Sequence, residues 1–169
     1  DPAWFRTEER WRQLQKAIAA QRIVRDHDAL PESAYRDDDK RGTVGAVALD
    51  RHGNLAAGTS TGGLTNKRYG RIGDPPVIGA GTWADNRSVA VSATGTGEMF
   101  IRSAASHTVA DLVRLAGSTP ADAADATLAE VAAIGGDGGL IVLDARGEYA
   151  MRFNTSGMYR GWIKPDGSR

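Results

Sequence analysis

A glycine followed by a threonine, Gly42-Thr43, stands where a polar, charged leader meets a strand-like run of small residues. If the bond between these two residues is cut, Thr43 gains a free α-amine beside its hydroxyl. The amine can then act as base for that hydroxyl, so one residue supplies both nucleophile and proton acceptor. An α-amine titrates near pH ~7.7–8.0, so much of it is neutral at physiological pH. Taken alone, the pair is better interpreted as a linker glycine before a β-branched strand residue.

The composition limits the classes of function. The chain has 169 residues, the size of one domain. Its 21 basic and 21 acidic residues balance, which gives no electrostatic basis for binding nucleic acid or an anionic membrane. No apolar run approaches the ~18–20 residues of a transmembrane helix, and no secretory signal is recognised. The absence of cysteine excludes disulfides and thiolate sites and fits a cytoplasmic location.

The chain divides into two unequal parts. Apolar residues at three- and four-residue steps predict an amphipathic helix over residues 3–24, and the charged stretch 25–42 predicts a mobile linker. Beyond the linker, strands followed by two helices and further strands predict an α+β sandwich with helices packed on a sheet face. The expected strands are 43–49, 55–60, 88–93, 140–144 and 149–154, and the expected helices are 98–117 and 120–134.

Five motifs resemble those of the plant-type L-asparaginase and isoaspartyl peptidase family, which belongs to the N-terminal nucleophile hydrolases. The resemblance covers nearly everything from Gly42 to Trp162, with the motifs in order and at family-like spacing. The motifs are GTVGAVALD (42–50), TSTGGLTNK (59–67), GRIGD (70–74), TGTGE (94–98) and FNTSGMY (153–159).

The resemblance implies a four-layer αββα sandwich, only partly supplied by this chain, made as an inactive precursor that cuts itself between Gly42 and Thr43. On that mapping, residues 1–42 are the C-terminal tail of the α subunit and residues 43–169 are the β subunit. The remaining α-subunit segment is expected as a partner, in a dimer of αβ units. No cofactor is expected, and a structural alkali cation would belong to that remaining segment.

The resemblance also implies the chemistry of the site. Thr43 would attack the side-chain carbonyl of L-asparagine, or the β-linked carbonyl of an isoaspartyl dipeptide, to give a β-aspartyl ester that water hydrolyses. Thr61 would orient the amine and hydroxyl of Thr43. The Thr94 hydroxyl and the Gly95 N–H would stabilise the negative charge that develops on the carbonyl oxygen.

Arg71 and Asp74 match the substrate-binding positions of the family. A guanidinium can hold the substrate's α-carboxylate through two parallel hydrogen bonds, and a carboxylate can hold its α-ammonium. Together the two side chains would recognise a zwitterion. Gly97 matches a further backbone position that contacts the amino-acid end of the substrate. Without the neighbouring motifs, Arg71 and Asp74 would be interpreted as a solvated surface ion pair.

Other candidate sites are weaker. His27, His52 and His107 are far apart in sequence and lack zinc spacing, and residues 37–39 lack the ligand pattern of a calcium loop. The glycines of residues 135–139 lack the Lys-Ser/Thr of a phosphate loop.

Three alternatives to the asparaginase hypothesis stay open. A glycosylasparaginase and a taspase-like endopeptidase are disfavoured, because Gly rather than Asp precedes Thr43. A binding or scaffold protein without activity would never expose Thr43 as an N-terminus.

Overall fold

The computed structural model of the chain describes residues 1–21 and 42–169. A short 3-10 helix, η1 (Pro2–Phe5), precedes the helix α1 (Glu8–Ala19), so the N-terminal helix is shorter than the predicted 3–24. Arg6 is extended, and the Thr7 hydroxyl accepts a hydrogen bond from the Arg10 N–H, which caps α1 at that point. At the other end Gln21 has a φ of +52°. The predicted linker, except for Gly42, lies outside the described residues.

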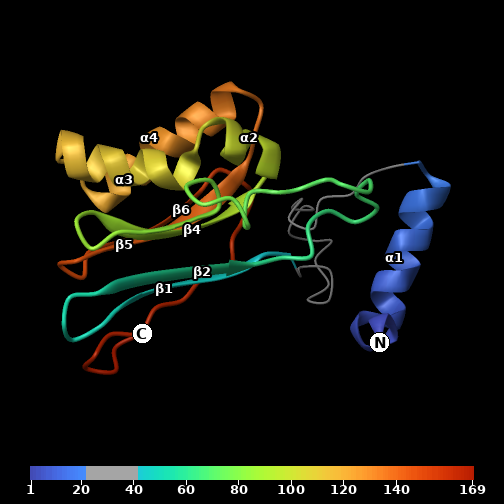
Figure 1. Cartoon of the computed structure of the whole chain (residues 1–169), viewed down its shortest axis with the longest axis horizontal. Helices are drawn as coiled ribbons and strands as arrows, with labels where there is room; N and C mark the ends of the chain where they lie inside the picture. The colour runs from blue at the N-terminus through green and yellow to red at the C-terminus, as the bar shows by residue number, and fades with distance from the viewer. Residues whose placement is uncertain (22–41) are drawn as a thin grey trace.

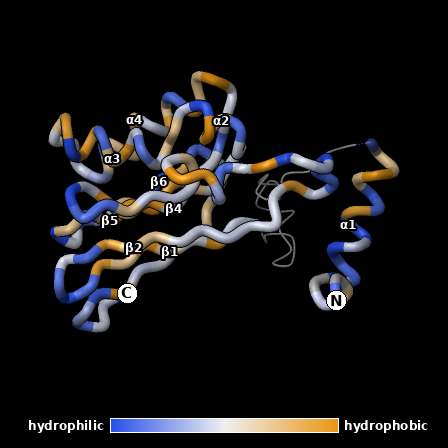
Figure 2. The backbone as a smooth tube through the Cα atoms, in the orientation of Figure 1, coloured by the Kyte–Doolittle hydropathy of each residue, from blue (hydrophilic) through white to orange (hydrophobic). Residues whose placement is uncertain are grey.

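The first two strands form the predicted hairpin. β1 (Val44–Leu49) pairs with β2 (Leu55–Ser60) in antiparallel register, with Val44 opposite Ser60 and Leu49 opposite Leu55. The connecting turn is closed by Asp50, whose carboxylate accepts hydrogen bonds of 2.8 Å from the N–H groups of His52 and Asn54. The turn is hydrophilic and the strands are less so, as Figure 2 shows.

A four-stranded antiparallel sheet lies against this hairpin. Its strands are β3 (Thr82–Ala84), β4 (Val89–Gly95), β5 (Gly138–Asp144) and β6 (Tyr149–Phe153), in the order β3-β4-β5-β6. The sequence did not predict β3, because three residues are too few to show an alternating pattern. The strands at 88–93, 140–144 and 149–154 were placed within two residues of where they lie.

Three helices cover the face of the four-stranded sheet that is turned away from the hairpin (Figure 1). They are α2 (Gly97–Arg102), α3 (Ala105–Ala116) and α4 (Pro120–Ala133). The described part of the chain is therefore an α+β fold in three layers: helices, a four-stranded sheet and a two-stranded sheet. None of its helices is long and apolar enough to cross a membrane.

The predicted helix over 98–117 is two helices, separated at Ala104. This residue adopts the left-handed conformation, with a φ of +44°. The first N–H groups of α3 bond to the preceding loop, since Ser106 and His107 donate to the carbonyls of Ala80 and Gly79. These tertiary hydrogen bonds stabilise the break between the two helices. The apolar periodicity of the sequence does not reveal them.

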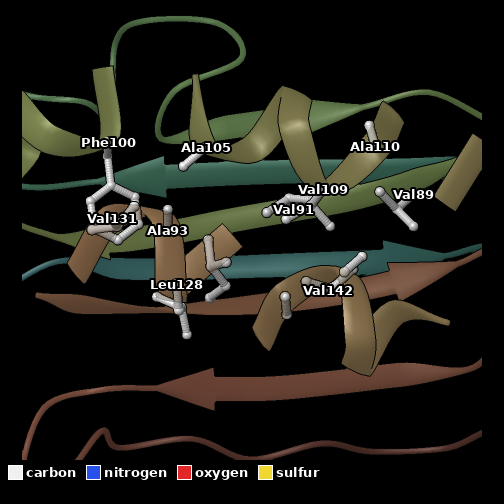
Figure 3. Packing of buried hydrophobic residues seen from close by; sticks show 13 residues of the cluster. Val89, Val91, Ala93, Phe100, Ala105, Val109, Ala110, Leu128, Val131 and Val142 are labelled. Atoms are coloured by element: carbon white, nitrogen blue, oxygen red, sulfur yellow. The ribbon is translucent and has the colours of Figure 1, made fainter. Parts of the chain in front are cut away.

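The hydrophobic core lies between the helices and the four-stranded sheet. Val109 from α3 lies beside Val91 of β4, and Phe100 from α2 lies farther along the cluster; all three are fully buried (Figure 3). Val131 of α4 and Val142 of β5 complete the same cluster. The well-packed sheet and helices form the rigid support from which the loops of the site extend.

The break at Ala104 carries a measurable strain, because left-handed backbone costs an L-residue roughly 1–2 kcal/mol. We expect Ala104→Gly to raise the free energy of unfolding by about 0.5–1 kcal/mol, since glycine has no Cβ to clash. Ala126→Gly, at an exposed position inside α4, is the matched control and should lower it by about 1 kcal/mol. Urea unfolding of the full-length protein followed by circular dichroism measures both changes. Equal losses in the two variants would show that Ala104 is not strained.

Candidate active site

Thr43 and Thr61 meet at the open end of the hairpin. Thr43 directly precedes β1 and Thr61 directly follows β2, so antiparallel pairing places the two residues opposite each other. The Thr43 hydroxyl donates to Oγ1 of Thr61 over 3.2 Å. Thr61 Oγ1 also accepts a 3.0 Å hydrogen bond from the backbone N–H of Gly63, which fixes its orientation. The structure thus brings together the predicted nucleophile and its predicted orienting group.

A second set of hydroxyl groups fastens this end of the hairpin to the four-stranded sheet. Thr59 of β2 lies 2.6 Å, Oγ to Oγ, from both Ser92 of β4 and Thr82 of β3. Beside them, a Cβ on Gly45 of β1 would collide with the Ser92 side chain. Thr59 is therefore placed to hold the hairpin, and Gly45 allows the two sheets to approach closely.

A pocket opens beside Thr43. It is lined by Gly42, Thr43, Thr61, Gly63, Leu64, Arg71, Asp74, Pro75 and Gly95. The lining includes both residues of the predicted cleavage site, Gly42 and Thr43. It also includes Arg71 and Asp74, the two residues predicted to bind a zwitterion. Two predicted site residues, Thr94 and Gly97, are absent from the lining.

Asp74 is buried although it is a carboxylate. Its side chain belongs to a residue that is only 4% exposed, and within the described part of the chain no group hydrogen-bonds its Oδ2 atom. Burial raises the pKa of Asp74 to about 6, against the opposing effect of the nearby Arg71 guanidinium. A buried, unpartnered carboxylate oxygen at a pocket wall is suited to receive a cation.

Gly97, the first residue of α2, packs directly on Asp74. A Cβ at this position would lie 2.8 Å from Oδ1 of Asp74 and 3.0 Å from its backbone nitrogen. Gly97 therefore acts on the pocket through Asp74, because its missing side chain leaves room for the carboxylate.

Arg71 is held by Glu98, a partnership that the sequence analysis missed. The Arg71 Nε and Nη2 atoms donate to the two carboxylate oxygens of Glu98 over 2.8 and 3.0 Å. This hydrogen-bonded pairing is the main reason that the pKa of Arg71 is raised. The two residues are 27 positions apart, so no local spacing rule connects them. The only signal was the acidic residue at the start of a predicted helix.

Gly95 and Thr94 end β4, opposite Gly138 and Gly139 of β5. Gly95 lines the pocket and has a φ of +154°, and a Cβ there would collide with the Asp137 carbonyl and the Phe100 ring. Just beyond, the Thr96 N–H donates to the Asp137 carbonyl over 2.8 Å. The backbone at Gly95 is thus fixed at the pocket wall. The oxyanion role of Thr94 and Gly95 stays a prediction.

The weaker candidates that lie within the described residues form no metal site. Among the residues that the structure describes, no group of three or more histidine or acidic side chains could hold a metal ion. His52 lies in the β1–β2 turn, and His107 packs edge-on against Trp83 at 4.6 Å between ring centroids. His27 and residues 37–39 lie outside the described residues.

The similarity to known proteins extends over the whole chain. The asparaginase family model matches residues 1–169. An isoaspartyl peptidase from Salmonella typhimurium is 51% identical over 162 residues, which cover 95% of this chain and 51% of the relative. An isoaspartyl peptidase from Escherichia coli is also 51% identical, over 95% of this chain and 50% of the relative. A plant-type L-asparaginase from Pyrobaculum calidifontis is 51% identical over 124 residues, 73% of this chain and 42% of the relative.

The five sequence motifs predict three features of the site. These are a hairpin that begins just after Thr43, an antiparallel sheet behind it, and Arg71 and Asp74 beside it, and the structure contains all three. The chain belongs to the asparaginase family. It spans about half the length of the curated relatives that it matches.

The buried charge of Asp74 should weaken the fold at neutral pH. Its pKa is about 6 in the native protein and 3.8 in the reference state, so the native state binds the proton more tightly. Stability is therefore lost as pH rises from about 4 to about 6. We expect Asp74→Asn to be more stable than wild type above pH 6, by the order of 2 kcal/mol, and the gain to vanish below pH 4. Thermal unfolding of the full-length protein between pH 3.5 and 8 checks this, and a variant less stable than wild type at pH 8 would contradict it.

Replacing Gly97 should disturb the pocket wall at Asp74. In Gly97→Ala the new methyl group would press on the Asp74 carboxylate, and overpacking of this kind costs about 1–3 kcal/mol, so we expect the free energy of unfolding to fall by that amount. Gly161→Ala is the control, because a Cβ there meets no atom within 4 Å. Urea unfolding of the full-length protein measures both variants. A Gly97→Ala variant as stable as wild type would show that Gly97 does not make room for Asp74.

Proposed function

We propose that this chain forms the nucleophile-bearing part of an autoprocessing amidohydrolase that hydrolyses L-asparagine and β-aspartyl dipeptides. One observation carries the proposal: the hydrogen-bonded Thr43–Thr61 pair shares a pocket with Arg71 and Asp74. Relatives that are 51% identical over most of this chain are named isoaspartyl peptidase.

The first step is cleavage of the chain itself. Gly42 and Thr43 both line the pocket, so the bond between them occupies the place where a substrate amide would later lie. The Thr43 hydroxyl attacks the Gly42 carbonyl, the C–N bond breaks to leave an ester, and water hydrolyses that ester. The products are a new carboxyl group on Gly42 and a free α-amine on Thr43.

The same hydroxyl then attacks the substrate. The Thr43 α-amine accepts the hydroxyl proton as Oγ1 bonds to the side-chain carbonyl carbon, and it returns the proton to the departing nitrogen. Ammonia leaves from L-asparagine, or an amine from a β-aspartyl dipeptide. Water, deprotonated by the amine, cleaves the β-aspartyl ester and regenerates Thr43 with release of aspartate.

Recognition follows from the charges of the pocket wall. Arg71 binds the α-carboxylate, and the unpartnered Oδ2 of Asp74 binds the α-ammonium. L-Asparagine and an N-terminal isoaspartyl residue both carry these two groups beside a β-carbonyl. The Thr94 hydroxyl and the Gly95 N–H stabilise the charge on that carbonyl in the transition state.

A fourth layer completes the sandwich. The outward side of β1 and β2 consists of small or exposed residues, among them Val44, Ala46, Ala56 and Gly58. We assign its cover to the part of the relatives' length that this chain does not span, in an αβ unit that dimerises. An alkali cation in that further segment, and the cytoplasmic location expected from the cysteine-free sequence, stay predictions.

Intact-mass measurement of the purified full-length protein tests the first step. We expect two species, one beginning at Thr43, whose masses sum to that of the precursor plus one water. Thr43→Ala should remain uncut and should release neither ammonia from L-asparagine nor aspartate from a β-aspartyl dipeptide. The Ala126→Gly variant is the control for an unrelated substitution.

Each other outcome has a definite meaning. An uncut wild type without turnover would favour a binding or scaffold protein. Turnover only of a glycan-linked asparagine would favour a glycosylasparaginase, and turnover retained by Thr43→Ala would overturn the mechanism.

A further inference from the structure

Glu98 lies at the edge of the proposed pocket and uses two of the hydrogen-bond donors of Arg71. It takes the side edge of the guanidinium, Nε and Nη2, and leaves Nη1 and the remaining hydrogen of Nη2. The Arg71 side chain is 16% exposed and that of Glu98 is 46% exposed. Because the two parallel hydrogen bonds are made at once, this pairing fixes how the guanidinium is turned.

Three of the residues that surround the Arg71 guanidinium are glycines. Cβ atoms on Gly63, Gly73 and Gly97 would lie 3.3, 2.9 and 3.1 Å from its Nη atoms. The guanidinium therefore lies among three glycines, and Glu98 decides how it is turned within that space.

Asp74 offers Arg71 a competing partner. It is buried, its Oδ2 has no hydrogen-bond partner in the described residues, and Arg71 is close enough to lower its pKa. Without Glu98, the guanidinium would be drawn to this carboxylate, because a buried charge without a partner is costly. An Arg71–Asp74 pair would leave neither side chain available to the charged groups of the substrate.

We propose that Glu98 is a positioning residue that holds Arg71 apart from Asp74 and presents its terminal edge to the substrate's α-carboxylate. The inference rests on the proposed function and extends it. The pairing of Arg71 with Glu98 leaves the Asp74 carboxylate for the α-ammonium.

The test compares Glu98→Ala and Glu98→Gln with wild type in the full-length, processed enzyme. We expect Glu98→Ala to raise KM for L-asparagine about tenfold or more with kcat within about threefold, which is the effect of losing charge-assisted hydrogen bonds in binding. Glu98→Gln keeps one acceptor and should show a smaller rise. Melting temperatures and the extent of cleavage before Thr43 should match wild type.

Two further measurements separate positioning from general disorder. 3-Aminopropanamide carries the ammonium group but no α-carboxylate, so its KM should also rise in Glu98→Ala if Arg71 has moved onto Asp74. The acidic limb of the kcat/KM profile begins with the Thr43 α-amine and steepens near pH 6, where Asp74 also takes up a proton. This second, lower break should move to lower pH in the same variant, because ion pairing with Arg71 lowers the pKa of a carboxylate.

The control is Arg87→Ala, which removes the Arg87–Asp85 pair outside the site, where Nε and Nη2 donate to Oδ1 and Oδ2, and it should leave all three readouts unchanged. An unchanged KM for L-asparagine in both Glu98 variants, or an effect on L-asparagine alone with a fixed acidic limb, would overturn the inference. If wild type turns over L-asparagine and both Glu98 variants have the same KM as wild type, only this inference fails and the proposed function stands. Wild type that neither turns over L-asparagine nor binds L-aspartate in calorimetry would defeat both proposals.

Discussion

The arrangement of the site depends on the close contact between the open end of the β1–β2 hairpin and the four-stranded sheet. Thr59 joins Ser92 and Thr82 through short hydroxyl contacts, and Gly45 has no side chain to separate the layers. Thr43 and Thr61 each lie two positions from a member of this contact. Because the backbone of the hairpin connects Thr43 and Thr61 to this contact, the position of Thr43 depends on the packing of the two sheets.

Burial has opposite effects on the free energy of folding in the core and at the site. The core places Phe100, Val109 and Val131 where their burial stabilises the fold, whereas Asp74 is buried at a cost. Arg71 is already matched by Glu98, so that cost is not offset by a dedicated partner. On the proposed function this cost has a use, since a carboxylate satisfied by its own protein has little affinity left for a ligand.

How much could be predicted from the sequence depended on whether a feature was local. The hairpin at Asp50 and the helix at Pro120 follow from turn and capping residues within a few positions, and both were placed correctly. The break at Ala104 was missed because its cause is a set of hydrogen bonds to a loop 25 residues earlier, at Gly79 and Ala80. The motifs brought Thr43, Arg71 and Asp74 into one hypothesis, and the structure places all three in one pocket. Neither the burial of Asp74 nor the Glu98 partner of Arg71 could be read from spacing, since both arise only when distant segments pack.

The presence of Gly42 in the pocket lining has a consequence for how such a molecule is controlled. On the proposed function, Gly42 of the uncut chain stays beside Thr43, covalently attached and therefore at a high effective concentration. A small molecule in solution would have to compete with a group that cannot diffuse away. Access to the pocket would then change once in the life of each molecule, when the Gly42–Thr43 bond is hydrolysed.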